Sequence, residues 1–387
     1  MRRVASLGVF PLLGAALVAG LGCARPIKTG DPLPGLTKQQ RELFEQGRKV
    51  MEKQFTPETG LGPLFNAPGC SECHEDPVTG GRGDESEVHV ALLRPDGFCD
   101  PLAERGGPVI QQHVTPALHA ALGIESEPVP PEATTRASRT SPDIFGLGLL
   151  DTVPDSKILA RADPEDRNHD GISGRPNRFT DGRLGRFGRK ALVPTLREFI
   201  EGAFVAEQGI TNPAVPTEES VGGSPLPPGV DPVPDPEIDQ KTVDAADAFV
   251  RFLAPPAPLE LTHLAKRGRV LFSRVGCAAC HVPILKTGKS PVKALCHKKV
   301  AAYTDLLLHD MGPDLADICL GLAAPSEFRT EPLMGLHLMP RFLHDGRADT
   351  LEKAILLHGG EATASRARFQ ALDDIHKKAL IKFLESL

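Results

Sequence analysis

The feature that most constrains this chain is a short motif, Cys-x-x-Cys-His, that occurs twice. One copy, "CSECH", spans residues 70–74, and the other, "CAACH", spans residues 277–281. Each copy places two thiols about one helical turn apart with an imidazole beside the second thiol. Two chemistries use such a group: the side chains bind a zinc ion directly, or the cysteines attach a haem whose iron the histidine coordinates.

Haem is the better interpretation of both copies. A zinc site needs four converging ligands, and neither motif has a second Cys-x-x-Cys or His-x-x-x-His partner at a usual spacing. Two matches in one chain favour two covalently attached c-type haems. We therefore predict haem 1 on Cys70, Cys73 and His74, and haem 2 on Cys277, Cys280 and His281.

The N-terminus predicts export. Residues 1–22 carry two arginines and a short apolar stretch that ends in small residues, which is typical of a signal peptide. The following Cys23 closes a "GLGC" segment that resembles a lipoprotein cleavage site, although Gly20 stands where such sites carry a Leu-like residue. We expect an exported protein that is either free in the periplasm or anchored by a lipidated Cys23 to a membrane surface, facing the periplasm or the outside.

Composition excludes one class of partner. The 387 residues carry a net charge of −6, with one Tyr and no Trp, so the chain lacks the basic surface and the stacking aromatics of a nucleic-acid-binding protein. We expect no nucleic acid and a redox donor or acceptor protein as partner.

Helical patterns precede both motifs. Before the second motif, apolar residues that include Leu271 and Phe272 recur at helical spacing, and the pattern stops at Gly276. Before the first motif, Thr37 and Gln40 form a capping-box pattern ahead of similar apolar spacing. Each pattern looks like the first helix of a cytochrome c domain.

The chain also predicts an internal duplication. Amphipathic segments at 241–256 and 376–387 both contain "FL", and each is expected to pack on the first helix of its own half. This gives one cytochrome c-like domain at 36–256, with long insertions, and a second at 257–387. The Pro-rich stretch 211–237 is predicted to be an extended surface loop of the first domain.

Four longer segments carry a family resemblance: "NHDGISGRPNRF" (168–179), "GRFGRKA" (185–191), "YTDLLLHDMGPDLAD" (303–317) and "FLHDGRADTLEKAILLHGGEA" (342–362). With them, the chain resembles the dihaem oxidoreductase family, often labelled thiol oxidoreductase, and is similar to the dihaem cytochrome c peroxidase superfamily. The resemblance implies an all-α protein of two cytochrome c-like domains with long irregular loops.

The resemblance also suggests the second ligand of haem 2. Relatives place it after the "HDG" motif, which here puts His358 in that position, and imidazole is a strong iron ligand. Met311 is the alternative. His309 and His344 also lie in the family segments, where they would contact haem propionates or cap turns.

The open side of haem 1 is less defined. In "GGPVIQQHV", Gln111 or Gln112 would suit an open peroxide site and act there as catalytic residues, whereas His113 would close it. The alternative is that all three are polar groups near the haem without a role in the reaction.

A calcium loop is a further hypothesis. Asp166, Asn168 and Asp170 alternate as calcium ligands do, and Ile172 would add its carbonyl oxygen. The twelfth position is Asn177 instead of Glu, so an Asx-rich turn without metal is the alternative. Dihaem peroxidases hold calcium between their domains, which favours the ion.

Besides Cys23, three cysteines lie outside the motifs: Cys99, Cys296 and Cys319. Cys296 and Cys319 both belong to the predicted second domain and could pair in an oxidising compartment, which would leave Cys99 unpaired, but the sequence alone does not decide the pairing.

These patterns predict a periplasmic dihaem c-type oxidoreductase. Electrons would enter at haem 2 and be used at haem 1 for peroxide reduction or substrate oxidation. The alternative is a non-catalytic electron-transfer cytochrome. Dihaem peroxidases typically carry a Trp between the haems, whereas "GRFGRKA" offers Phe187 and Arg189.

Overall fold

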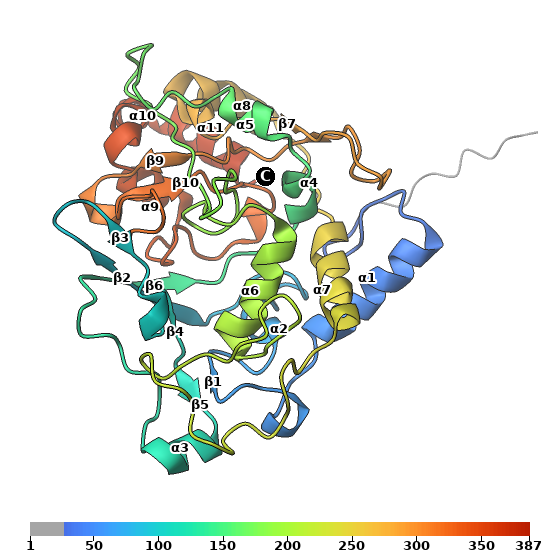
Figure 1. Cartoon of the computed structure of the whole chain (residues 1–387). Helices are drawn as coiled ribbons and strands as arrows, with labels where there is room; N and C mark the ends of the chain where they lie inside the picture. The colour runs from blue at the N-terminus through green and yellow to red at the C-terminus, as the bar shows by residue number, and fades with distance from the viewer. Residues whose placement is uncertain (1–26) are drawn as a thin grey trace, which may run out of the picture.

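The computed structural model describes residues 27–387 (Figure 1). The predicted signal peptide at 1–22 and the predicted lipidation site Cys23 lie outside these residues. No helix within 27–387 combines the length and apolar character needed to cross a membrane.

Helices form the two ends of the molecule. The α-helices of the described residues are α1 (Lys38–Met51), α2 (Cys70–Cys73), α3 (Pro116–Leu122), α4 (Leu147–Asp151), α5 (Asp155–Leu159), α6 (Leu196–Gln208), α7 (Gln240–Phe252), α8 (His263–Val275), α9 (Leu351–Leu357), α10 (Thr363–Gln370) and α11 (Asp374–Leu384). Short 3-10 turns are η1 (Pro57–Thr59), η2 (Ala103–Arg105), η3 (Cys277–Ala279), η4 (Pro313–Leu315), η5 (Leu336–Leu338) and η6 (Gly360–Ala362).

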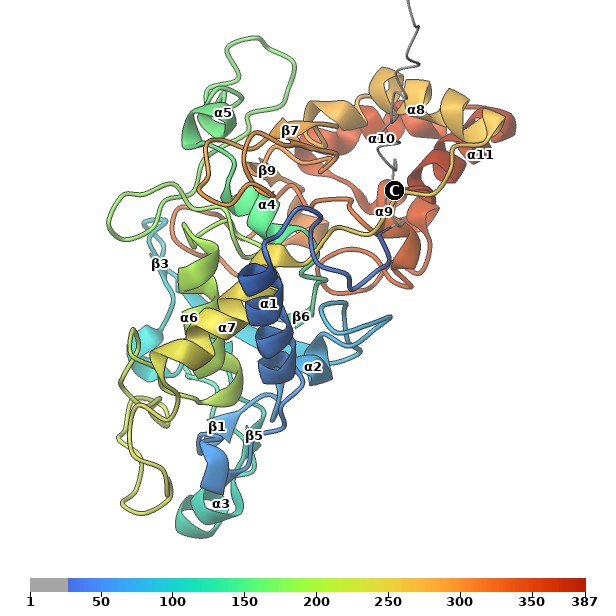
Figure 2. The same cartoon turned by 90° about the vertical axis from the view of Figure 1, so that its right-hand side faces the viewer.

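Helices α1 and α7 cross closely and lie side by side in both views (Figures 1 and 2). The predicted capping box of Thr37 and Gln40 starts α1. At the crossing, a Cβ on Gly47 would lie 1.9 Å from the carbonyl oxygen of Ala245 and 2.7 Å from Cβ of Phe249. Glycine is therefore required at this position for the two helices to approach.

Helices α8 and α11 repeat this crossing in the C-terminal half. A Cβ on Gly268 would lie 1.9 Å from the carbonyl oxygen of Ala379 and 2.8 Å from Cβ of Phe383. The partner residues are again an alanine and a phenylalanine four positions apart. Both expected packings of a closing helix on a first helix are thus confirmed, and their shared contacts support the internal duplication.

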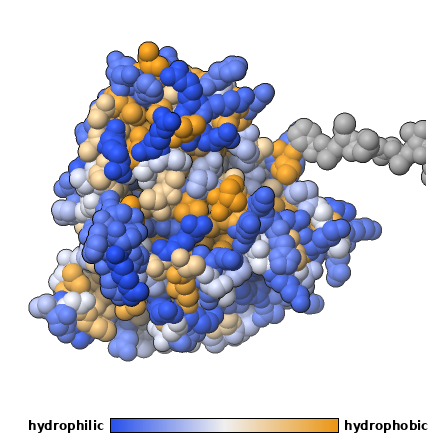
Figure 3. Space-filling model, turned by 90° about the horizontal axis from the view of Figure 1, so that it is seen from above, coloured by the Kyte–Doolittle hydropathy of each residue, from blue (hydrophilic) through white to orange (hydrophobic). Residues whose placement is uncertain are grey.

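The hydrophobic core extends across the predicted domain boundary. One cluster contains Phe44, Phe249 and Leu253 together with Val282 and Leu307 from beyond residue 257. A second cluster is built on α8 and α11. Seen from above, hydrophobic residues also reach the surface in a central area bordered by hydrophilic ones (Figure 3). The division into 36–256 and 257–387 stays a prediction.

The expectation of an all-α fold is wrong. The chain is 33% helix and 14% strand, a mixed α/β structure with several small antiparallel sheets. The strands are β1 (Leu64–Phe65), β2 (Ser86–Leu93), β3 (Cys99–Asp100), β4 (Val109–Ile110), β5 (His113–Val114), β6 (Thr135–Thr140), β7 (Leu285–Lys286), β8 (Lys299–Val300), β9 (Leu308–Asp310) and β10 (Glu327–Arg329).

The largest sheet explains why the structure differs from the expected all-α fold. Strand β2 lies at its centre and pairs with β3, β4 and β6, the last over the register Ser86–Thr140 to Ala91–Thr135. Val90 and Ala91 point to opposite faces of this strand, and both are fully buried. Strand β2 is stable here because residues from distant parts of the sequence cover both of its faces. The smaller sheets are β1–β5, β7–β8 and β9–β10.

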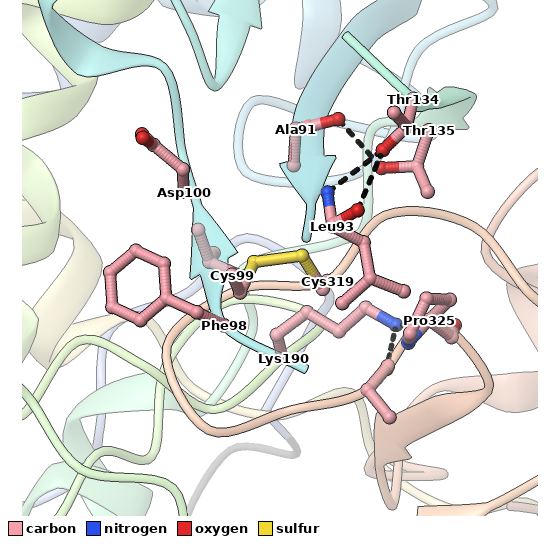
Figure 4. Close-up of a disulfide and its surroundings, with 12 residues drawn as sticks. Ala91, Leu93, Phe98, Cys99, Asp100, Thr134, Thr135, Lys190, Cys319 and Pro325 are labelled. Atoms are coloured by element: carbon pink, nitrogen blue, oxygen red, sulfur yellow. Dashed lines mark hydrogen bonds between the residues drawn. A yellow bond between two sulfur atoms is a disulfide. The ribbon is translucent and has the colours of Figure 1, made fainter. Parts of the chain in front are cut away.

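A disulfide joins this sheet to the C-terminal half (Figure 4). It links Cys99 of β3 to Cys319, 220 residues later, with Cα atoms 5.8 Å apart. The pairing that the sequence left undecided is thus Cys99 with Cys319, and the possible pair of Cys296 with Cys319 does not form, because Cys296 is free. The pairing of β3 with β2 carries Cys99 to a cluster with Ala91 and Ile318. Closing so long a loop removes freedom from the unfolded chain, which stabilises the fold by ~5 kcal/mol in the chain-entropy model.

The helix crossings give a stability prediction. Gly268→Ala should destabilise the protein by about 3 kcal/mol, because its Cβ would force α8 away from the α11 backbone. Gly202→Ala in α6 is the matched control. A Cβ there meets no atom within 4 Å, so this change should stabilise by ~0.5 kcal/mol through helix propensity. Urea unfolding of both variants measures this, and equal midpoints would contradict the close crossing.

Candidate functional site

The second motif begins where helix α8 ends. Gly276 has a φ of 104°, a left-handed conformation that glycine adopts without strain, and it confirms the predicted helix stop. The chain then enters the turn η3, in which the backbone N–H of His281 donates to the carbonyl of Cys277. This turn places Cys277, Cys280 and His281 along the wall of one cavity.

The cavity is largely apolar and suits a flat aromatic macrocycle. His358 and Met311, the two predicted ligands on the far side of haem 2, line it together with the motif. Its apolar walls include Phe272, Leu336, Phe342, Leu351, Ile355 and Leu384. A porphyrin ring buries an apolar surface of this kind while its iron takes ligands from both sides. The structure thus brings together every residue predicted for haem 2.

The three histidines predicted to bind iron share one hydrogen-bond arrangement. In each, Nδ1 contacts a backbone carbonyl oxygen: His74 to Gly81 at 3.1 Å, His281 to Tyr303 at 2.9 Å and His358 to Ala354 at 2.7 Å. A carbonyl can only accept, so Nδ1 carries the proton and donates it. In the neutral ring, Nε2 then keeps its lone pair, which is the atom and tautomer that a metal ion needs.

The same rings are neutral at physiological pH. Burial lowers the pKa of His74 and His358, and burial together with the neighbouring His358 lowers the pKa of His281 to about 4. Metal binding requires an unprotonated ring nitrogen, so these low pKa values suit ligands. The influence of His358 on His281 also shows that the two rings lie near each other at this cavity.

Two other histidines line the cavity with different surroundings. Both ring nitrogens of His309 are occupied, Nε2 by Asp305 at 2.9 Å and Nδ1 by Glu361 at 2.6 Å. Burial opposes charge on this ring, but the two carboxylates outweigh it and raise the pKa of His309 to about 12. His344 stacks on Phe328 with ring centres 4.5 Å apart. His309 therefore has no free nitrogen for iron.

The first motif lies in the short helix α2, which follows Gly69. Cys73 is buried, and Cys70 Sγ lies 3.4 Å from Oε1 of Gln208 on α6. Burial raises the pKa of both cysteines to about 12, so both are thiols at neutral pH. An opening beside this motif is lined by residues that include Glu72 and His113.

Two carboxyl groups near the first motif were not foreseen from the sequence. Glu87 on β2 and Glu207 on α6 both act electrostatically on Cys73. Burial, followed by the charge of Glu87, raises the pKa of Glu207 well above its usual value. Burial also opposes charge on Glu87, but a hydrogen bond from His89 keeps the pKa of Glu87 low. The two carboxyl groups thus have pKa values shifted in opposite directions, upward for Glu207 and downward for Glu87.

The predicted residues on the open side of haem 1 lie in the region of the first motif but do not hydrogen-bond to it. The amide of Gln111 donates to the carbonyl of Ala206, and the amide of Gln112 donates to the carbonyl of Ser86. His113 is exposed in β5. None of these hydrogen bonds reaches the first motif, and a catalytic role for Gln111 and Gln112 stays a prediction.

Direct zinc binding by the motifs gains no support. Within residues 27–387, one group of at least three His, Cys, Asp or Glu side chains brings its ligand atoms within 4.8 Å of one another, and it contains no motif residue. That group is Glu218, Asp231, Asp235 and Glu237, all from the predicted Pro-rich loop, which indeed forms neither helix nor strand.

The predicted calcium loop satisfies its own backbone. Oδ1 of Asp166 accepts from the N–H of Asp170, and Oδ1 of Asp170 accepts from the N–H of Ile172. The side chain of Asn168 donates to Asp170 at 3.1 Å. Asn177, the twelfth position, is buried and donates to the carbonyls of Lys190 and Leu320. Calcium binding by Asp166, Asn168, Asp170 and Ile172 stays a prediction.

A polar wall of the second cavity was also missed. Arg189, Arg329, Thr330 and Glu331 line it, and Glu331 forms ion pairs with both arginines. The sequence signal was present, because Arg189 lies in "GRFGRKA" and Arg329 starts "RTEPLMGLHLM". Only the fold shows that these two segments meet.

The comparison with protein families identifies the class. The family described as "Di-haem oxidoreductase, putative peroxidase" matches residues 132–387. The chain belongs to this family of dihaem oxidoreductases, which confirms the resemblance and implies two haems. Comparison with curated proteins gives no match.

Three solved structures have a partial likeness to this chain. The diheme peroxidase BthA from Burkholderia thailandensis is 16% identical, with 93% of this chain and 87% of that chain covered and a TM-score of 0.43. A MauG-like protein associated with microbial copper homeostasis is 17% identical, with 94% and 93% covered and a TM-score of 0.41. Hydrazine synthase from Kuenenia stuttgartiensis is 15% identical, with 100% of both chains covered and a TM-score of 0.38.

The cavity gives a ligand prediction. His358→Ala should convert the iron of haem 2 from low spin to high spin, because it removes one of two axial nitrogens. His358→Met should keep the iron low spin and raise its reduction potential. His376→Ala, at a half-buried histidine of α11 that pairs with Asp373, should change neither property. Absorption spectra and redox titration measure this, and an unchanged low-spin haem 2 in His358→Ala would move the assignment to Met311.

Proposed function

We propose that the protein is an exported dihaem c-type oxidoreductase in which haem 2 receives electrons and haem 1 uses them. Haem 1 is attached through Cys70 and Cys73, with His74 as iron ligand. Haem 2 is attached through Cys277 and Cys280, with His281 and His358 as its two axial ligands. When bound, the haems supply the one-electron chemistry, and the protein supplies ligands, burial and protons.

The observation that carries this proposal is the difference between the two motifs. The second motif faces an apolar cavity with two neutral histidines, so both axial positions of its iron can be filled. Such an iron suits electron transfer. Around the first motif, Gln208 contacts Cys70 and the carboxyl groups of Glu207 and Glu87 act electrostatically on Cys73, and such polar surroundings suit an iron with one position open to a small oxidant.

Peroxide reduction is the reaction that the first motif supports best. Converting hydrogen peroxide to two waters takes two electrons and two protons. Burial and the charge of Glu87 raise the pKa of Glu207, which favours its protonated form, and the next residue, Gln208, contacts Cys70 through its side-chain oxygen. A positioned carboxylic acid that donates a proton in this way contributes typically 10²- to 10⁴-fold to a rate.

Export is supported by the disulfide. Cys99 and Cys319 join segments 220 residues apart, and disulfides persist mainly in oxidising compartments outside the cytoplasm. Together with the predicted signal peptide, this favours the periplasm, where a redox partner protein would deliver or take electrons. Lipidation of Cys23 would hold the protein at a membrane surface.

Covalent attachment gives the first functional prediction. The denatured protein should keep the mass of two haems, because thioether bonds survive unfolding whereas coordinated metal ions are lost. Cys70→Ala combined with Cys73→Ala should remove one haem, and Cys277→Ala combined with Cys280→Ala should remove the other. Cys296→Ala, at the free cysteine, should keep both. A wild-type mass equal to the bare polypeptide would contradict c-type attachment.

Peroxide turnover tests the reaction itself. Glu207→Gln should lower kcat for peroxide reduction by at least ~10²-fold, because the amide cannot donate the proton. Glu201→Gln, on the same helix and paired with Arg197, should leave turnover unchanged. If the reduced wild-type protein consumes no peroxide and both irons are six-coordinate, the electron-transfer cytochrome becomes the better function.

A further inference from the structure

One wall of the second cavity is polar, in contrast to the rest. Arg189 and Arg329 lie in this wall beside Thr330 and Glu331. The side chains of Arg189 and Arg329 are 14% and 6% exposed. Their guanidinium ends are fixed: Glu331 Oε2 lies 3.1 Å from Arg189 and 2.8 Å from Arg329. The arginines thus have little freedom to reach water.

Three buried donors in this wall have no acceptor among the described residues. They are Nε of Arg189, Nε of Arg329 and Oγ1 of Thr330. A buried polar group without a partner costs about 1–3 kcal/mol, and more when it is charged. Three such groups on a single cavity wall indicate that an acceptor belongs there.

The charge of the wall indicates an anion. Both arginines are always protonated, and Glu331 is ionised because they hold its pKa at about 2 against the effect of burial. Two positive charges therefore face one negative charge, and the wall keeps a surplus of one positive charge. A buried charge is stable only when it is paired. Carboxylates suit guanidinium groups best because the two can form paired hydrogen bonds.

We propose that Arg189, Arg329 and Thr330 bind the propionate carboxylates of haem 2. This rests on the proposed function, since it requires haem in the second cavity. A haem carries two carboxylates at one edge of its ring, and no other part of it is anionic. The wall therefore fixes the rotation of the ring within the cavity, while Cys277 and Cys280 fix its attachment.

The assignment also orients haem 2 toward the first motif. Nη2 of Arg189 donates to the carbonyl oxygen of Thr140 at 3.2 Å. Further along this segment, the N–H of Ile144 donates to the carbonyl of Gly80, and the N–H of Gly80 donates to the carbonyl of His74. The propionate edge of haem 2 would therefore face the segment that leads to the first motif. Arg189 would then be a positioning residue on that side of haem 2.

The test uses the full-length holoprotein. Arg189→Gln should shift the propionate bending band of haem 2 in the resonance Raman spectrum, because a donor to the carboxylate is lost. Removing a positive charge should also disfavour the reduced iron, so that the ferrous-to-ferric ratio of haem 2 at a fixed potential falls by about tenfold. Arg183→Gln is the matched control, since this exposed arginine pairs with Asp181 and Glu198 and should change neither readout.

A second variant separates binding from folding. Arg189→Lys keeps the charge but loses the planar fork, so it should restore the ferrous-to-ferric ratio while the Raman band stays shifted. If Arg189→Gln fails to incorporate haem 2, the Raman band of Arg189→Lys alone tests whether Arg189 binds the propionates. An unchanged band and ratio in a protein that carries both haems would overturn this proposal and leave the proposed function intact.

Two further outcomes separate the alternatives. A wild-type protein without haem on Cys277 and Cys280 would overturn the proposed function and the propionate assignment together. If added chloride changes the spectrum of wild-type haem 2 but not that of Arg189→Gln, the wall binds a free anion. That result would overturn the propionate assignment alone.

Discussion

The hydrogen bond from a histidine Nδ1 to a backbone carbonyl determines which ring nitrogen is left unprotonated, and therefore which one can bind a metal ion. It occurs at His74, His281 and His358, and in each it leaves Nε2 as an unprotonated acceptor. Burial favours the neutral rings, so these bonds leave in each ring the nitrogen that the proposed iron binding requires. The helix crossing at Gly268 serves this arrangement in the C-terminal half, because it fixes α8, which ends at Val275, directly before the second motif.

The two halves share this plan but differ in chemistry. The C-terminal half surrounds its motif with an apolar cavity, two histidines and a guanidinium wall. The N-terminal half surrounds its motif with carboxyl and amide groups. Under the proposed function, the C-terminal half would hold an electron and the N-terminal half would supply a proton. The segment from Thr140 to Ile144 contacts both sides, through Arg189 and through Gly80.

The sequence predicted local features well and long-range ones poorly. The capping box at Thr37 and the helix stop at Gly276 depend on nearby residues, and both are confirmed. The packing of α1 on α7 and of α8 on α11 joins distant segments, and it could be predicted because the same helical pattern occurs in both halves. The sheet around β2 and the Cys99–Cys319 disulfide join segments far apart in the chain, and no local pattern encodes such pairings.

The candidate site shows the same division. The motif residues could be read directly from the spacing of cysteine and histidine. Glu87 and Glu207 could not, because an isolated glutamate in a strand or helix gives no signal until the fold buries it beside Cys73. An electron paramagnetic resonance spectrum of the ferric holoprotein tests the account most directly. We expect one low-spin signal from haem 2, bound by His281 and His358, and one high-spin signal from an open haem 1. Two low-spin signals would contradict the open iron, and two high-spin signals would contradict the ligand pair of haem 2.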